Sequence, residues 1–372
     1  MSADPLRHAS PSERYAADLA AGTLLPDPAQ AAAVGILEGI FASLHAQPPA
    51  NGNGLVDRLL GRRRALWPPV RGAYLWGPVG RGKTYLVDTF FDALPFAHKR
   101  RLHFHSFMRE VHAELRKRTF EADPLKQIAA AWATQVRVLA LDEFHVGDIT
   151  DAMLLHGLLD SLVEQGVTLI ATSNEAPDEL YSGGLQRARF VPAIELLKAS
   201  LSVFEVAGAT DYRLRALEQA PVYYCCAAGE ARVELERSFL RLAGAAHAAE
   251  PLVIDGREIP TVRHGDGIAW VTFAVLCRGA RSAADYVELA RCHHTVLLED
   301  VPVLGTEDGD PTRRLINLVD ALYDHNVNLI VSAAAEPEGL YRGTRLAKPF
   351  LRTASRMREM RSRDYLARQH LA

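Results

Sequence analysis

Eight consecutive residues have the composition and spacing of a loop that binds phosphate. The stretch matches the pattern G-x-x-x-x-G-K-[ST] and reads Gly77, Pro78, Val79, Gly80, Arg81, Gly82, Lys83 and Thr84. Glycines let consecutive backbone N–H groups point toward one anion, and the start of a following helix adds partial positive charge. Lys83 would contact the β- and γ-phosphates of a nucleotide, and the Thr84 hydroxyl would bind Mg²⁺. The pattern predicts a site for a nucleoside triphosphate and Mg²⁺ that includes these residues and Tyr85.

Two adjacent acidic residues, Asp142 and Glu143, follow an apolar run at 136–141. A buried strand would bring both carboxylates to its carboxyl end, where ligands bind in open α/β sheets. Alone, the pair is typical of a solvated strand end, but together with the phosphate-binding loop it indicates catalysis. Asp142 would hold Mg²⁺, and Glu143 would orient and polarise the water that attacks the γ-phosphate. The additional acid favours transfer to water, and therefore an NTPase, over a metabolite kinase.

Polar residues also follow the next apolar run, 167–171, in the tripeptide Thr172-Ser173-Asn174. The Asn174 amide would lie beside the γ-phosphate if this strand adjoins the one that carries Asp142, and a simple turn is the alternative. Further along are Arg187 and Arg189. An exposed arginine there could complete the site of a neighbouring subunit and stabilise charge on the transferring phosphoryl group. Ordinary surface arginines are the alternative.

Short apolar runs alternate with longer amphipathic stretches around these residues. Runs at 73–76, 101–105, 136–141 and 167–171 predict strands, and stretches at 84–94, 108–119 and 148–165 predict helices. This alternation predicts an α/β fold with a mainly parallel sheet flanked by helices. We expect an N-terminal helical segment and linker at 1–60, a nucleotide-binding core at 61–206 and a C-terminal α+β region at 207–372. In that last region, strands are expected at 269–276, 295–301 and 327–331, with a hairpin turn at 255–256.

The sequence also contains one weak internal repeat. Residues 166–181 (GVTLIATSNEAPDELY) resemble residues 326–341 (NVNLIVSAAAEPEGLY). Helix-to-strand units of a parallel sheet converge on such patterns, which is the favoured interpretation, and a degenerate duplication is the alternative. The second stretch has no lysine or asparagine at the positions where the first has functional residues. Under both interpretations we therefore expect it to have a structural role only.

Composition and charge exclude several classes of protein. Hydrophobic residues make up 48% of the chain and charged residues 23%, so the chain can bury a core. The 42 basic and 45 acidic residues give a net charge of -3, which provides no global field for nucleic acid or an anionic membrane. Four cysteines without Cys-x-x-Cys spacing favour reduced thiols in the cytosol. The acidic N-terminus resembles no targeting signal, and no run approaches the roughly 18 to 20 apolar residues of a membrane span.

Local clusters of charge and of metal-binding residue types remain. A basic tail follows residue 341 and contains Arg342, Arg345, Lys348, Arg352, Arg356, Arg358, Arg361, Arg363 and Arg368 against Glu359 and Asp364. A solvated helix face explains it, and a dock for an acidic partner or an anionic lipid surface is the alternative. His103 and His105 alternate on a predicted strand, but no acid or cysteine accompanies them at metal-ligand spacing. The triplet 292–294, Cys-His-His, predicts a loop.

Longer strings resemble one family. The stretch LALDEFHVGDITDAMLLHGLLDSLVEQGVTLIATSNEAPDELYSGGLQRARFVPAI is similar to the ZapE cell-division ATPases of bacteria and their mitochondrial AFG-type relatives, within the AAA+ superfamily. The resemblance continues through RLHFHSFMREVH, SAADYVELARCHHTVLLEDVPVL and RTASRMREM, and it covers nearly the whole chain from about Tyr15. Ser106 stands where the family has arginine, and Val87 where methionine is usual. A sensor-two arginine has two candidates, Arg213 and Arg356.

The resemblance implies an AAA+ core that binds ATP and Mg²⁺ and hydrolyses ATP. It also implies that Asn174 is a sensor and that Arg187 is an arginine finger between subunits of a homo-oligomer. For bacterial members it implies a cytoplasmic protein recruited to the division site that acts on polymers of FtsZ. The mitochondrial relatives are associated with turnover of inner-membrane subunits.

These observations combine into one hypothesis with two rivals. We expect a Mg²⁺-dependent ATPase that remodels FtsZ polymers, with Lys83, Glu143 and Arg187 as catalytic residues. Peripheral contact with the inner membrane would involve the basic tail. A quality-control ATPase for membrane proteins is the first rival. A nucleic-acid-stimulated ATPase ranks last, because no basic stretch is interleaved with aromatic residues.

Overall fold

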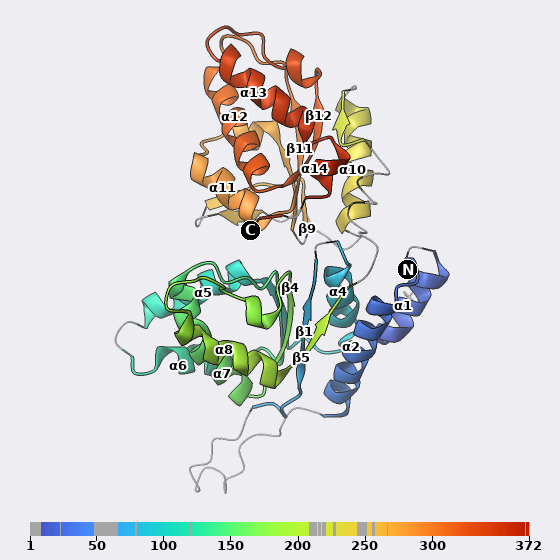
Figure 1. Cartoon of the computed structure of the whole chain (residues 1–372), viewed down its shortest axis with the longest axis vertical. Helices are drawn as coiled ribbons and strands as arrows, with labels where there is room; N and C mark the ends of the chain where they lie inside the picture. Colours follow the sequence, from blue (N-terminus) through green and yellow to red (C-terminus); the bar gives the residue numbers. More distant parts are fainter. Residues whose placement is uncertain are drawn as a thin grey trace, which may run out of the picture. The chain divides into compact units, whose positions relative to one another are not determined.

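The computed structural model describes residues 9–22, 24–47, 66–78, 80–118, 121–207, 214, 217, 221–225, 228–243, 251–254, 257–265, 267–368 and 370–371. The chain divides into two compact units, residues 1–210 and residues 211–372 (Figure 1). Each unit has its own sheet and its own buried core.

The first unit is built on a parallel sheet with the strand order β2-β3-β4-β1-β5. Its strands are β1 (Gly72–Trp76), β2 (Lys99–His103), β3 (Val138–Asp142), β4 (Thr168–Ser173) and β5 (Leu201–Glu205). The predicted α/β fold is therefore confirmed. Strand β4 lies between β1 and β3, so the strand before Asn174 does adjoin the strand that carries Asp142.

Helices cover both faces of this sheet (Figure 1). They are α1 (Pro11–Ala20), α2 (Pro28–Ala46), α4 (Lys83–Ala93), α5 (Phe104–Lys117), α6 (Pro124–Ala133), α7 (Ile149–Glu164) and α8 (Arg187–Ser200), with the short 3-10 helix η1 (Pro177–Glu179). Side chains alternate along the strands, so that Ala140 and Ile170 pack toward α2 and α4 whereas Leu139 and Leu169 pack toward α5–α8. The near-continuous apolar strands follow from this burial on both faces.

Helix α2 is the one helix among the described residues that is long and apolar enough to cross a membrane, judged by length and composition. This differs from the expectation that no run approaches such a length. Six of its residues are buried, including Leu37, Ile40 and Leu44, which belong to the core that α2 shares with β1 and α4. In this structure the apolar face of α2 is used for packing within the first unit.

Two strands end earlier in the sequence than expected. Strand β2 ends at His103, and α5 starts at Phe104, so His105 is helical and does not alternate with His103 on a strand. The reason is the helical spacing of Phe104, Phe107 and Val111, which are all buried. In the second unit the expected strand at 269–276 ends at Thr272 and continues as a π-helix, because a continuous apolar run carries no period that distinguishes the two.

The second unit has a mixed sheet with the order β6-β12-β11-β10-β9, in which only the β9–β10 pair is antiparallel. Its strands are β6 (Tyr223–Tyr224), β9 (Arg263–Gly265), β10 (Ile268–Thr272), β11 (Thr295–Val301) and β12 (Asn328–Ala333), beside a hairpin of β7 (Leu252–Ile254) and β8 (Arg257–Ile259). The helices are α10 (Ala228–Ala243), the π-helix η2 (Ala274–Arg278), α11 (Ala283–Cys292), α12 (Gly309–Asp324), η3 (Pro337–Gly339), α13 (Ala347–Glu359) and α14 (Arg363–Leu366). Residues 255–256 of the expected hairpin turn lie outside the described residues.

The close approach of β1 to β4 gives a test of the first sheet. A Cβ atom on Gly72 would lie 1.7 Å from the Leu169 carbonyl oxygen, which is backbone and cannot rotate away. We predict that Gly72→Ala lowers the free energy of unfolding by about 3 kcal/mol or more. The matched control is Gly39→Ala in α2, where a Cβ meets nothing within 4 Å and where alanine favours the helix by about 1 kcal/mol. Urea denaturation followed by circular dichroism measures both, and equal midpoints for the two variants would contradict the register.

Candidate nucleotide-binding site

The predicted phosphate-binding loop connects β1 to α4 at the carboxyl edge of the first sheet. Three glycines have the positive φ angles that L-residues avoid: Gly77 (139°), Gly80 (80°) and Gly82 (80°). Gly82 is the N-cap of α4. A Cβ atom at Gly82 would also lie 2.5 Å from the Gln30 Nε2 atom and would displace that amide. Val79 lies outside the described residues.

Gln30 of α2 forms a hydrogen bond with this loop. Its side chain is buried, and its Nε2 donates a hydrogen bond of 3.0 Å to the Arg81 carbonyl oxygen. Tyr85 follows Thr84 and is the last residue of the predicted binding loop. Its hydroxyl donates a hydrogen bond of 2.5 Å to the Asp18 carboxylate of α1. Burial and that carboxylate raise the pKa of Tyr85 above its usual range. Neither Gln30 nor Asp18 belongs to a motif in the sequence.

The Lys83 ammonium is held at the centre of the loop. It donates to the carbonyl oxygens of Gly77 at 2.5 Å and Pro78 at 2.8 Å, and to the Asn174 Oδ1 atom at 3.1 Å. Lys83 and Asn174 are 91 residues apart in sequence. The structure therefore brings together the lysine and the amide that were predicted independently to face one phosphate.

The acidic pair lies at the end of the neighbouring strand β3. Thr172 of β4 organises both residues, because its hydroxyl donates to Asp142 Oδ1 at 3.1 Å and accepts the Glu143 backbone N–H at 3.1 Å. Glu143 has a φ of 51°, which ends the strand. The Asp142 side chain is 4% exposed, whereas that of Glu143 is 33% exposed. One carboxylate is thus buried and fixed, and the other faces the solvent side of the site, 3.9 Å from His103 Nδ1.

Arg101 of β2 completes the surroundings of Asp142, and sequence reasoning missed it. Its Nε donates to Asp142 Oδ2 at 2.5 Å, and its Nη1 forms an ion pair with Asp88 of α4. A buried carboxylate is costly unless it is paired. The strand reads Lys-Arg-Arg-Leu-His, so no signal in the sequence indicates that Arg101 rather than another of its basic residues would pair with Asp142.

The donor set fits a nucleoside triphosphate with Mg²⁺. Glycines in conformations that a side chain would block, together with the Lys83 ammonium, are suited to phosphate. The Asp142 carboxylate and the Thr84 hydroxyl are oxygen ligands of the type that Mg²⁺ prefers. Thr84 is exposed in the first turn of α4.

Arg187 is the first residue of α8, at the surface of the first unit. Its guanidinium Nη2 donates to the Asp178 carbonyl oxygen at 2.5 Å, and its side chain is partly buried. Of the two sensor-two candidates, Arg213 lies outside the described residues, and Arg356 forms ion pairs within the second unit with Asp320 (2.9 Å) and Asp324 (3.2 Å).

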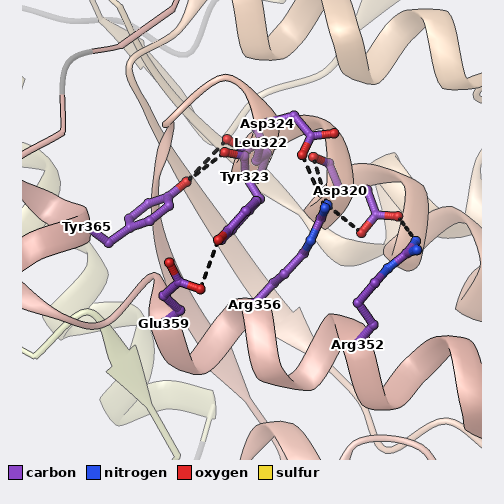
Figure 2. Close-up of polar contacts among 8 residues, drawn as sticks. All are labelled: Asp320, Leu322, Tyr323, Asp324, Arg352, Arg356, Glu359 and Tyr365. Atoms are coloured by element: carbon purple, nitrogen blue, oxygen red, sulfur yellow. Dashed lines mark hydrogen bonds and ion pairs between the residues drawn. The ribbon is translucent and has the colours of Figure 1, made fainter.

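The basic tail is folded and mostly neutralised. Figure 2 shows Arg352 and Arg356 of α13 directed at Asp320 of α12, with Tyr323 and Glu359 joined beside them. Five arginines of the tail form ion pairs, namely Arg352, Arg356, Arg358, Arg361 and Arg368. Three further basic residues, Arg342, Arg345 and Lys348, are exposed and have no ion pair among the described residues.

Comparisons with known proteins identify the family of the chain. A family model described as "AFG1-like ATPase" matches residues 9–369. The chain belongs to this family. It is an ATPase of this family, and the resemblance stated from the sequence is confirmed. The chain is 44% identical over 374 residues to the cell division protein ZapE of Escherichia coli K12, covering 99% of this chain and 100% of that protein.

More distant relatives match with less of their length. Lactation elevated protein 1 homolog B of Danio rerio is 36% identical over 282 residues, which is 72% of this chain and 56% of that protein. Among solved structures, the crystal structure of DnaI aligns with a TM-score of 0.36 at 17% identity, covering 50% of this chain and 88% of DnaI.

Thr172 offers a test of how the acidic pair of this AFG1-like ATPase is positioned. We predict that Thr172→Val reduces ATP hydrolysis about tenfold, because one lost hydrogen bond to a charged group costs about 1.5 kcal/mol. Thr168→Val on the same strand is the matched control: Thr168 is also buried, and its hydroxyl has no hydrogen-bond partner among the described residues. Steady-state hydrolysis and thermal melting compare the two, and equal rates would contradict the role of Thr172.

Proposed function

We propose that this ATPase hydrolyses Mg²⁺-bound ATP in its first unit and uses the cycle to remodel FtsZ polymers at the bacterial division site. The observation that supports hydrolysis most directly is the convergence of Lys83, Asn174 and the Asp142–Glu143 pair on one edge of the sheet. The division role is supported by full-length similarity to a cell division protein at 44% identity.

The proposed mechanism assigns one task to each side chain. Lys83 exchanges its carbonyl partners for phosphate oxygens, while Asn174, already in contact with it, remains beside the γ-phosphate. Thr84 and Asp142 hold Mg²⁺, which would neutralise charge on the β- and γ-phosphates. Glu143 takes a proton from the attacking water, a task that suits its partial exposure and its fixed backbone.

Arg187 is proposed to act on the site of a neighbouring copy in a homo-oligomer. It lies at the start of α8 beside Leu185, which is 70% exposed, and Val191, which is 37% exposed. Exposed apolar side chains around a polar anchor are typical of a protein contact. A second copy of the chain is the partner that would bring a phosphoryl group to this arginine.

We propose a cytoplasmic location for the protein, with peripheral contact at the inner membrane or septum as a secondary feature. Such contact with an anionic surface would depend on Arg342, Arg345 and Lys348, because five other arginines of the basic tail are neutralised by ion pairs.

Glu143→Gln tests hydrolysis and the division role together. We predict that the variant binds ATP but hydrolyses it at least about 10²-fold more slowly, because general-base catalysis contributes that much. Hydrolysis is measured with and without assembled FtsZ while light scattering follows the polymers. The expected result is stimulation by the polymers and a change in scattering that the variant abolishes. Near-normal turnover would reject Glu143 as the base.

The same assay distinguishes the rival functions. Hydrolysis that is indifferent to FtsZ but accompanied by a co-purifying protease would favour turnover of membrane proteins. Stimulation by DNA with steep salt dependence would favour a nucleic-acid ATPase.

Mixing two inactive variants tests whether Arg187 acts between subunits. Lys83→Ala keeps the arginine but loses the nucleotide site, and Arg187→Ala has the reverse defect. We predict that each is inactive alone and that the mixture recovers part of the activity, because sites of one variant meet arginines of the other. Arg189→Ala, an exposed arginine on the same helix, is the control and should hydrolyse normally. A mixture that stays inactive would contradict action in trans.

A further inference from the structure

The second unit repeats the element order of the first. Helix α12 (309–324) begins and ends 160 residues after α7 (149–164), and β12 (328–333) stands at the same interval from β4 (168–173). The 3-10 helices η1 and η3 and the starts of α8 and α13 keep this interval. Parallel strands also match: β11 and β6 flank β12 as β3 and β1 flank β4.

The two faces of the sheets correspond as well. Ala140 and Ile170 belong to the core beneath α4, the helix that follows β1. Their counterparts by position, Leu297 and Ile330, belong to the core beneath α10, the helix that follows β6. A shift of one residue would reverse these faces. The correspondence is therefore one of register and not only of element order.

Side-chain hydrogen bonds are repeated at the same positions. Tyr74 of β1 donates to the Glu175 carbonyl oxygen at 3.0 Å, and Tyr223 of β6 donates to the Ala335 carbonyl oxygen at 2.6 Å. The two tyrosines pair with equivalent residues of the neighbouring strand, Ala171 and Val331.

The end of β11 repeats the acidic turn of β3. Asp300 has a φ of 61° and donates its backbone N–H to the Ser332 hydroxyl at 2.8 Å, as Glu143, with a φ of 51°, does to Thr172. Glu299 thereby takes the place of Asp142, and its side chain is equally buried, at 2% exposure. General sterics of parallel sheets do not require a left-handed residue tied to a hydroxyl at this point. Convergence, the interpretation favoured from sequence, does not account for it.

The residues that would contact a nucleotide are absent from the second unit. Ala334 stands in the place of Asn174, and Ala347 in the place of Arg187. Between Tyr224 and Ala228 the chain has three residues, and its sequence there lacks the glycine-lysine pair of the phosphate-binding loop.

A basic side chain pairs with Glu299, the acid that the second unit has kept at the end of β11. Arg232, in the second turn of α10, donates its Nη1 to Glu299 Oε1 at 2.8 Å, and its guanidinium carbon lies 5.7 Å from the centroid of the Trp270 ring. Burial raises the pKa of Glu299, and Arg232 opposes this effect. In the first unit the corresponding helix starts with Lys83 and Thr84, beside the carboxylate proposed to hold Mg²⁺. That carboxylate also receives the Arg101 guanidinium from β2, whereas Trp270 stands at the equivalent position of β10.

We propose that the second unit is a degenerate copy of the nucleotide-binding unit, in which the Arg232 guanidinium is the permanent cation of the buried acid, in place of the Arg101 guanidinium and the metal ion proposed for the first unit. The second part of this proposal rests on the proposed role of Asp142 as a metal-binding carboxylate. The copy keeps the contacts that stabilise the sheet and has lost those that serve a ligand.

Nucleotide stoichiometry tests the loss of the second site. Titration of the full chain with fluorescent ADP and Mg²⁺ should give one site per chain, and Lys83→Ala should abolish it. Two sites, or one that persists in Lys83→Ala, would overturn the proposal. Absence of any site in the wild type would instead reject the proposed function, and the metal test that follows would still decide whether Arg232 replaces a cation.

Thermal melting tests the replacement of the metal ion. Arg232→Ala should lower the melting temperature by several degrees, because a buried carboxylate loses its partner, and Arg232→Ala with Glu299→Gln should regain much of the loss. Arg237→Ala, whose arginine pairs with Glu234 at the exposed surface of the same helix, should have little effect.

Added Mn²⁺ then provides the decisive comparison. It should raise the melting temperature of Arg232→Ala more than that of the double variant, since both keep the site of the first unit and differ only at Glu299. Equal Mn²⁺ shifts, or a double variant as unstable as Arg232→Ala, would overturn the assignment of Arg232 as a substitute for the metal.

Discussion

A buried carboxylate at the end of a strand must be paired, and this requirement organises the first unit. Asp142 receives a hydroxyl from β4 on one side and a guanidinium from β2 on the other, so β3 has to lie between them. Arg101 is in turn paired with Asp88 of α4, the helix that begins with Lys83. Charge neutralisation therefore connects the phosphate-binding loop to two strands that are not adjacent to it.

The parts of this arrangement that depend on local sequence were predictable. Glycine spacing identified the loop, and apolar runs located the strands that deliver Asp142 and Asn174. Both depend on backbone sterics and burial within a few residues, which a single sequence displays directly.

The supporting residues were not predictable in the same way. Thr172 is 30 residues from Asp142 and Arg101 is 41 residues from it, so their contacts exist only once the strand order is known. Gln30 is 51 residues from Arg81. His105 shows a different limit, because the change from β2 to α5 occurs inside a run that satisfies both periods. The choice between convergence and duplication depends on the same kind of information, because the repeated hydrogen bonds of Thr172 and Ser332 are features of tertiary structure.

The contact between Gln30 and the Arg81 carbonyl oxygen has a consequence for the N-terminal helices. The amide fills the space that a side chain at Gly82 would occupy, so a shift of the loop toward α2 would displace either the Gln30 side chain or the helix. Thermodynamic coupling between two positions is reciprocal. A restraint on α2 that changed the affinity of the loop for phosphate would therefore require that phosphate change, by the same free energy, how firmly α2 is held.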